Sequence, residues 1–188
     1  MILQKESSER IVDRMHKIND NEIIQRCKNG DMESFGEIVQ KYQRVIYTIV
    51  LRMLRDPADA EDITQTAFIK AYEKLDSYKT NHSFYSWIYR IAVNEALNFI
   101  KKSERLVELH DTHNSIEDDP ETEYSKNELQ TRIDNALENL KPEHRVIIVL
   151  RHFGELTYRD ISEILDIPEK TVKSRLFSAR QELRTILT

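Results

Sequence analysis

The sequence predicts an all-α protein made of two small helical domains joined by a flexible acidic linker. Three observations carry this prediction. The 188 residues include only 3 Gly and 4 Pro, too few turn residues for a β-rich fold of this length. Apolar residues recur at steps of three and four through most of the chain, which is the spacing of one face of an α-helix. Charge is the third observation, because it divides the chain into three parts.

The net charge of −5 is unevenly distributed along the chain. Residues 1–102 hold 16 Lys and Arg against 15 Asp and Glu, and residues 131–188 hold 10 against 9. Residues 103–130 hold 2 against 9. A polar, acidic stretch between two balanced blocks with helical periodicity is typical of a linker. We therefore expect an N-terminal extension at 1–19, a first domain at 20–102, a linker at 103–131 and a second domain at 132–188.

The first block predicts four helices. A short one spans residues 20–28, with Gly30 as its stop signal. A long apolar stripe follows over residues 32–54. Asp56 and Pro57 then suit an N-cap and the first position of a third helix, and Ser83 suits the cap of a fourth. Four helices of this size can bury a modest core.

The last block predicts a helix-turn-helix. Pro142 opens one helix, and Thr157 begins a sequence with the spacing of a capping box. A final helix follows Pro168, and residues 168–184 hold 5 Lys and Arg against 2 Asp and Glu. A locally basic helix after a short helix and a tight turn is typical of DNA-binding modules. A three-helix interaction module with a solvated basic face is the alternative that this pattern leaves open.

Several classes of function find no support in the sequence. The single cysteine, Cys27, excludes an intrachain disulfide and a Cys-rich zinc site. No apolar run reaches the length of a membrane span, and the charged N-terminus does not resemble a signal peptide. The pair His110 and His113 lies in the acidic stretch without a nearby cysteine. We expect a cytoplasmic protein that is not an enzyme and carries no cofactor or metal.

Three segments resemble the extracytoplasmic-function (ECF) group of bacterial alternative sigma factors. They are DPADAEDITQTAFIKAY at 56–72, FYSWIYRIAVNEALNFI at 84–100 and LTYRDISEILDIPEKTVKSRLFSARQEL at 156–183. The middle segment is the most specific of the three. The resemblance covers both helical blocks, about three quarters of the chain. It implies that the first block is region 2 of a sigma factor and the last block is region 4.

The resemblance implies a surface that binds core RNA polymerase, through the clamp of the β′ subunit and also the β subunit. Carboxylates on a helix can pair with basic residues of such a partner. They also stabilise the N-terminus of their own helix without any partner. Thr66 departs from the family, which usually has a carboxylate there. The matching positions are Asp59, Glu61, Asp62, Gln65 and Phe68.

In the family, region 2 also opens the promoter −10 element and reads it as a single strand. Single-stranded bases are bound by stacking and by polar groups at their edges. We expect Tyr89 and Arg90 to leave the apolar face of their helix, whereas Trp87 is as well explained by core packing as by base stacking. The expected −10 residues are Lys79, Asn81, Tyr85, Ser86, Tyr89, Arg90 and Asn94.

Region 4 reads the −35 element in the family, with its second helix in the major groove. Lys and Ser can donate hydrogen bonds to base edges or phosphates. Lys170 and Ser178 depart from the usual Gly and Arg, so no −35 sequence is predicted. The expected −35 residues are Lys170, Thr171, Lys173, Ser174, Arg175, Ser178 and Arg180.

The resemblance thus implies a sigma factor that binds core polymerase and directs promoter-specific transcription initiation, as in stress responses. Promoter DNA and an anti-sigma factor are the further expected partners. The family's linker threads the active-site cleft of the polymerase, where an acidic strand could mimic RNA or serve as a spacer. A free-standing helix-turn-helix regulator is the alternative function, and residues 1–19 have no predicted role.

Overall fold

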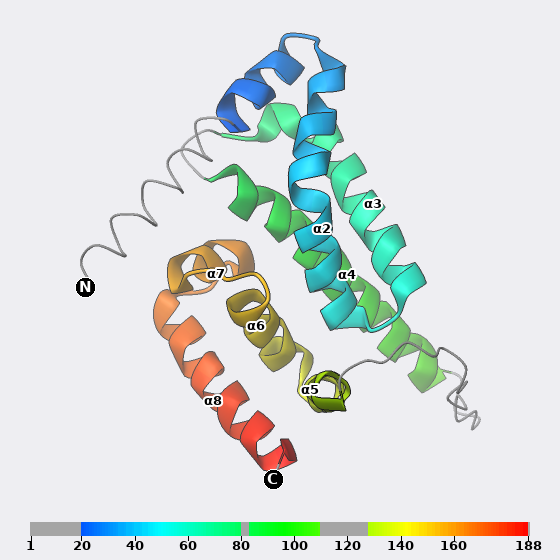
Figure 1. Ribbon diagram of the computed structural model, residues 1–188, viewed down its shortest axis with the longest axis vertical. Helices are drawn as coiled ribbons and strands as arrows, with labels where there is room; N and C mark the ends of the chain where they lie inside the picture. The colour runs from blue at the N-terminus through cyan, green and yellow to red at the C-terminus, as the bar shows by residue number, and fades with distance from the viewer. Residues whose placement is uncertain (1–19, 80–82, 110–127, 188) are drawn as a thin grey trace.

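The computed structural model describes residues 20–79, 83–109 and 128–187, and within them every regular element is a helix and none is a strand (Figure 1). The all-α prediction is therefore confirmed. The elements after a first helix at 20–28 are η1 (Met32–Ser34), α2 (Phe35–Leu54), α3 (Pro57–Glu73), η2 (Leu75–Ser77), α4 (Phe84–Leu109), α5 (Glu128–Glu138), α6 (Pro142–His152), α7 (Tyr158–Leu165) and α8 (Glu169–Leu187).

The break between α2 and α3 has the local chemistry that the sequence predicts. Arg55 ends α2 in the left-handed conformation, with φ of 66°. Asp56 follows as N-cap of α3, and its side chain accepts a hydrogen bond of 2.8 Å from the Asp59 amide. Pro57 occupies the first turn, where it costs no intrahelical hydrogen bond. The two helices consequently form an antiparallel pair, which α4 covers (Figure 1).

The core of the first domain lies between α2, α3 and α4, with the 20–28 helix at one end. One charged group is enclosed in it: Asp20 is 2% exposed. Its carboxylate accepts hydrogen bonds from Tyr42 Oη at 2.5 Å and from Lys41 Nζ at 2.6 Å. Burial and the adjacent Asp20 carboxylate raise the pKa of Tyr42 well above its usual range, so the phenol stays a hydrogen-bond donor and satisfies the acid.

The second domain contains the predicted helix-turn-helix. Thr157 and Asp160 form the capping box at the start of α7, with both reciprocal hydrogen bonds present. Asp166 ends α7 in the left-handed conformation, with φ of 56°, and this residue turns the chain into α8. The apolar stripe of α8 is buried against α6 and α7; it consists of Val172, Leu176 and Ala179.

Both ends of the predicted linker are helical. Helix α4 continues to Leu109, and α5 begins at Glu128. The remainder, including His110 and His113, lies outside the described residues. The linker boundaries at 103 and 131 stay a prediction.

The two domains pack against each other and share one hydrophobic core. Helix α6 lies on α2, and α7 lies on α4 (Figure 1). Sequence periodicity predicted each domain separately and gave no sign of this contact. It determines which of the predicted functional surfaces are accessible.

Candidate nucleic-acid and polymerase interfaces

Helix α8 presents a basic and hydroxyl-rich surface to solvent. Its buried stripe faces the domain core, so the residues between the stripe positions point outward. Of the predicted −35 residues, Thr171 and Arg175 are half-buried. The exposed ones are Lys170, Lys173, Ser174, Ser178 and Arg180. The structure therefore brings all seven predicted −35 residues onto one helix and exposes five of them.

Contacts at the turn orient α8. The Ser162 hydroxyl donates a 2.6 Å hydrogen bond to the Ile167 carbonyl and fixes the turn between α7 and α8. The ammonium of Lys173 lies 5.7 Å from the centre of the Tyr158 ring, within reach of a cation–π attraction. At the other end of the exposed face, Arg180 lies 3.4 Å from His152. Two of the cations are thus held near the surface by neighbouring rings.

Phe177 is a candidate that the sequence analysis missed. It is 66% exposed, the highest exposure among the large apolar residues of the described segments. It lies on α8 directly before Ser178, among the predicted −35 residues. An exposed ring there can contact the methyl group of thymine in a major groove. Because Phe177 lies off the buried stripe of Val172, Leu176 and Ala179, the sequence could have indicated that its side chain is exposed.

The predicted −10 surface lies at the start of α4. Lys79, Arg90 and Asn94 are exposed there, and Tyr85 is half-buried. Asn81 lies outside the described residues. Tyr78 anchors the chain before α4, because it is 3% exposed and its ring packs 5.2 Å from that of Phe84. Burial, with a smaller contribution from Asp20, raises the pKa of Tyr78 to about 12.

Two expected −10 residues are buried, which corrects the sequence analysis. Tyr89 is 6% exposed, and its ring packs against those of Tyr42 and Tyr85 at 6.5 and 6.0 Å. The expectation that Tyr89 leaves the apolar face is wrong, because α2 covers that side of α4 as well. Ser86 is 4% exposed, and its hydroxyl has no hydrogen-bond partner among the described residues.

A cavity of about 280 Å³ separates the start of α4 from α7. Trp87 and Arg90 line it from α4, and Glu163 and Asp166 line it from the helix-turn-helix. Arg90 Nη2 lies 3.1 Å from Asp166 Oδ2. The remaining lining residues are Ser77, Tyr78, Lys79 and Ser86. The predicted −10 surface therefore faces the second domain.

The exposed side of α3 is acidic. Glu61, Asp62 and Gln65 are exposed, and the Gln65 amide donates a 3.3 Å hydrogen bond to Glu61. Partial burial and the nearby Asp56 and Asp62 raise the pKa of the Asp59 carboxyl. This face can meet a basic partner without any rearrangement of α3.

Phe68 does not belong to that exposed surface. It is 7% exposed and packs in the core of the first domain, so its expected direct contact with polymerase is wrong. Ile69, which the sequence analysis did not select, is 59% exposed on the same helix. An isolated exposed isoleucine beside carboxylates can add apolar contact to a charged interface.

The described residues contain no helix long and apolar enough to cross a membrane. Within those same segments no group of three or more His, Cys, Asp or Glu side chains could hold a metal ion. Arg and Lys on α8, carboxylates on α3 and a mixed aromatic and basic surface on α4 are thus the main functional surfaces. Such a set is typical of a helical protein that contacts nucleic acid and a protein partner.

Comparison with known proteins identifies the family. Sigma-70 region 2 matches residues 38–106, and sigma-70 region 4 matches residues 130–183. The sigma factor SigW of Bacillus subtilis is 36% identical over 86% of this chain and 92% of its own length. The sigma-E factor of Escherichia coli K12 is 33% identical over 89% of this chain and 93% of its own. The chain belongs to the ECF sigma factors of RNA polymerase, as predicted from the resemblance.

Solved structures share the arrangement of helices. The sigma factor RpoE of Bartonella quintana, in complex with the anti-sigma factor NepR, is 25% identical. It aligns with a TM-score of 0.68 over 82% of this chain and 97% of its own. CnrH, in complex with the cytosolic domain of CnrY, has a TM-score of 0.67 at 20% identity and covers 88% of this chain and 94% of its own, which supports the fold.

Proposed function

We propose that this sigma factor reads the −35 element with α8 as duplex DNA and the −10 element with the start of α4 as a single strand. One observation carries the proposal: five of the seven predicted −35 residues are exposed on one basic helix of a helix-turn-helix. Lys and Arg supply the phosphate attraction and Ser supplies hydrogen bonds to base edges. Phe177 adds an apolar contact.

Core polymerase binding is assigned to the acidic face of α3. Its carboxylates Glu61 and Asp62 are exposed, and α3 packs on α2 and α4 whereas α7 packs on α4. A basic surface on the polymerase would be attracted to it, which favours encounter and orientation more than affinity. The cytoplasm, where the polymerase transcribes the chromosome, is the proposed location.

The test is run-off transcription by bacterial core RNA polymerase with and without this chain, on a library of genomic fragments from the source bacterium. A sigma factor yields discrete transcripts that need both the chain and core polymerase. A double substitution, Glu61→Lys with Asp62→Lys, should reduce transcript yield and binding to core polymerase together. Transcripts unchanged by this charge reversal would refute the assignment of α3.

An anti-sigma factor is the proposed regulatory partner. RpoE of Bartonella quintana, which shares the fold over most of this chain, was solved with such a partner. The proposal predicts that purification of the tagged chain from uninduced cells recovers a protein that competes with core polymerase for it. Recovery of core polymerase alone would indicate control by synthesis of the sigma factor.

A further inference from the structure

We propose that the 20–28 helix positions the −10 reader. Two of its side chains, Asn21 and Lys28, hold the segment that leads into α4 and so fix how Lys79 and the first turn of α4 are presented to a single strand. This inference rests on the proposed function only for the role of the held surface. The contacts themselves lie within the first domain and can be tested without polymerase or promoter.

The 20–28 helix is fixed to α2 at its first residue. The Asp20 carboxylate is 2% exposed and accepts hydrogen bonds from Lys41 and Tyr42 of α2, at 2.6 and 2.5 Å. Removing a buried charge from its partners is costly, so the helix keeps one position on α2. Its apolar side is buried in the core of the first domain and consists of Ile23, Ile24 and Cys27.

At its other end, the 20–28 helix reaches the chain that precedes α4 (Figure 1). Lys28 Nζ donates hydrogen bonds to the Tyr78 carbonyl at 3.2 Å and to the Asp76 carbonyl at 3.4 Å. The side chain of Lys28 is half-buried. An ammonium group has three donors and no acceptor, so it can join two carbonyls at once. Lys28 therefore fixes the backbone on both sides of Ser77.

Asn21 adds a second contact from the first turn of the same helix. The Tyr78 hydroxyl donates a 3.4 Å hydrogen bond to Asn21 Oδ1. Tyr78 is thus held through its carbonyl by Lys28 and through its hydroxyl by Asn21. Both supports come from one helix that is itself fixed to α2.

Tyr78 transmits this position to α4. Its ring is 3% exposed and lies 5.2 Å from the ring of Phe84 and 5.5 Å from that of Trp87. Phe84 and Trp87 both belong to the first turn of α4. Tilted and edge-to-face ring pairs favour one relative orientation. A shift of Tyr78 would therefore move or loosen the start of α4.

The groups positioned in this way belong to the predicted −10 surface. Lys79 directly follows Tyr78 and is exposed, and Tyr85 in the first turn of α4 is half-buried. Binding costs less when the side chains that make the contacts are already held in place. Asn21 and Lys28 are accordingly positioning residues, which act on a single strand through Tyr78 and α4 and need no contact with DNA.

A cation near a nucleic-acid surface can also bind phosphate directly, and the salt dependence separates the two roles. Loss of one phosphate contact lowers the slope of log affinity against log salt by about 0.7 for a single strand. Loss of a positioning residue lowers the affinity and leaves the slope unchanged. The half-buried Lys28 ammonium already binds two carbonyls, which favours the positioning role.

Trp87 reports the position of Tyr78 in the full chain without a label, because it is the only tryptophan of the sequence and packs on the Tyr78 ring. Lys28→Met removes both hydrogen bonds to the carbonyls and keeps an unbranched side chain. We expect stronger acrylamide quenching of Trp87 and lower anisotropy of its fluorescence in this variant. Lys28→Arg retains donors for both carbonyls and should resemble wild type.

Arg26→Met is the matched control, since it removes the same charge from the same helix, and Arg26 pairs with Glu37 of α2. It should leave the Trp87 signal unchanged. Circular dichroism identifies variants that fail to fold, and Asn21→Ala, which removes only the contact with the Tyr78 hydroxyl, should give a smaller increase in quenching. Equal quenching in wild type and the folded variants of Lys28 and Asn21, or the same increase in Arg26→Met, would overturn the anchoring.

Binding of fluorescein-labelled single-stranded DNA of random sequence to the holoenzyme tests whether the anchoring serves strand reading. Lys28→Met should weaken this binding by about threefold to tenfold and keep the salt slope of wild type. Lys28→Arg should restore the binding, and Arg26→Met should leave it near wild type. Binding of Lys28→Met to core polymerase, titrated separately, should equal that of wild type, a result that a general loss of folding would not give.

The outcomes separate this inference from the proposed function. Equal binding of the strand by the wild-type and Lys28→Met holoenzymes, or a slope lowered by about 0.7, would overturn the positioning role. A wild-type holoenzyme that binds the strand no better than core polymerase alone would refute strand reading by α4 and the role of the anchor in it. The fluorescence of Trp87 would still decide whether Lys28 and Asn21 hold the segment before α4.

Discussion

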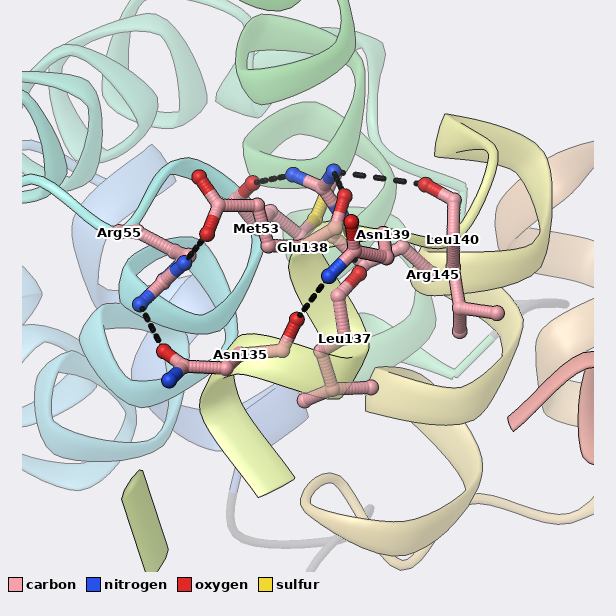
Figure 2. A network of polar contacts seen from close by, with 8 residues as sticks. All are labelled: Met53, Arg55, Asn135, Leu137, Glu138, Asn139, Leu140 and Arg145. Atoms are coloured by element: carbon pink, nitrogen blue, oxygen red, sulfur yellow. Dashed lines mark hydrogen bonds and ion pairs between the residues drawn. The ribbon is translucent and has the colours of Figure 1, made fainter. Parts of the chain in front are cut away.

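Replacing Arg145 by alanine tests how strongly the second domain depends on one guanidinium. Arg145 donates hydrogen bonds to the carbonyls of Leu137 at 3.0 Å, Met53 at 2.9 Å, Glu138 at 2.7 Å and Leu140 at 3.4 Å (Figure 2). It therefore joins α6 to the end of α5 and to the end of α2. All of these acceptors are carbonyls near helix ends, and the Leu137 carbonyl also accepts a 3.2 Å hydrogen bond from the Leu140 amide.

The expected loss of stability follows from these bonds. The two partly buried bonds to Leu137 and Met53 are charge-assisted, and such bonds contribute about 1–2 kcal/mol each after solvent exchange. The bond to Leu140 is long and the one to Glu138 is exposed, so they add little. Arg145→Ala should lower the free energy of unfolding by about 2–4 kcal/mol and, for a chain of this length, the Tm by about 5–15 °C.

Urea unfolding followed by circular dichroism measures this loss. Arg145→Lys keeps the charge but lacks the fork that reaches several carbonyls, so it should fall between wild type and alanine. Arg159→Ala is the control, since its side chain is 79% exposed and pairs only with Glu163 in the described segments; it should change stability by less than about 0.5 kcal/mol. A loss under about 1 kcal/mol for Arg145→Ala would refute the reasoning.

Three further predictions concern α8, α4 and pH. Lys173→Ala should weaken binding of the holoenzyme to duplex −35 DNA and reduce the salt slope of log affinity by about 1, measured by anisotropy at several salt concentrations; an unchanged slope would remove Lys173 from the phosphate contacts. Arg90→Ala should leave duplex capture intact and impair strand opening in permanganate footprints, and loss of polymerase binding instead would contradict the assignment of α4. Burial and the cations Arg180 and Arg151 lower the pKa of His152, so the folded state disfavours the protonated ring. The free energy of unfolding therefore carries its full contribution from neutral His152 above the ordinary pKa of 6.5, and this contribution is lost as the pH falls below it. In His152→Gln the urea midpoint should decline less on acidification than in wild type, and equal declines would contradict a role of His152 in the pH dependence.

The sequence was sufficient to predict the helices and most of their ends. Helix ends at Asp56, Pro57 and Thr157 depend on the residue and its near neighbours, so local chemistry predicts them. The seven residues of the −35 set were likewise predicted on one helix, because a single buried stripe on α8 determines which positions face outward.

The predictions failed where a residue's burial depends on elements distant in sequence. Tyr89 lies off the main stripe of α4, yet Tyr42 of α2 packs against it. Ser86 is covered at the junction with α7, and Phe68 in the core of the first domain. Periodicity in one helix shows the face toward its main partner and cannot show a second partner on another side. Docking of the two domains is long-range in the same sense and escaped prediction for that reason.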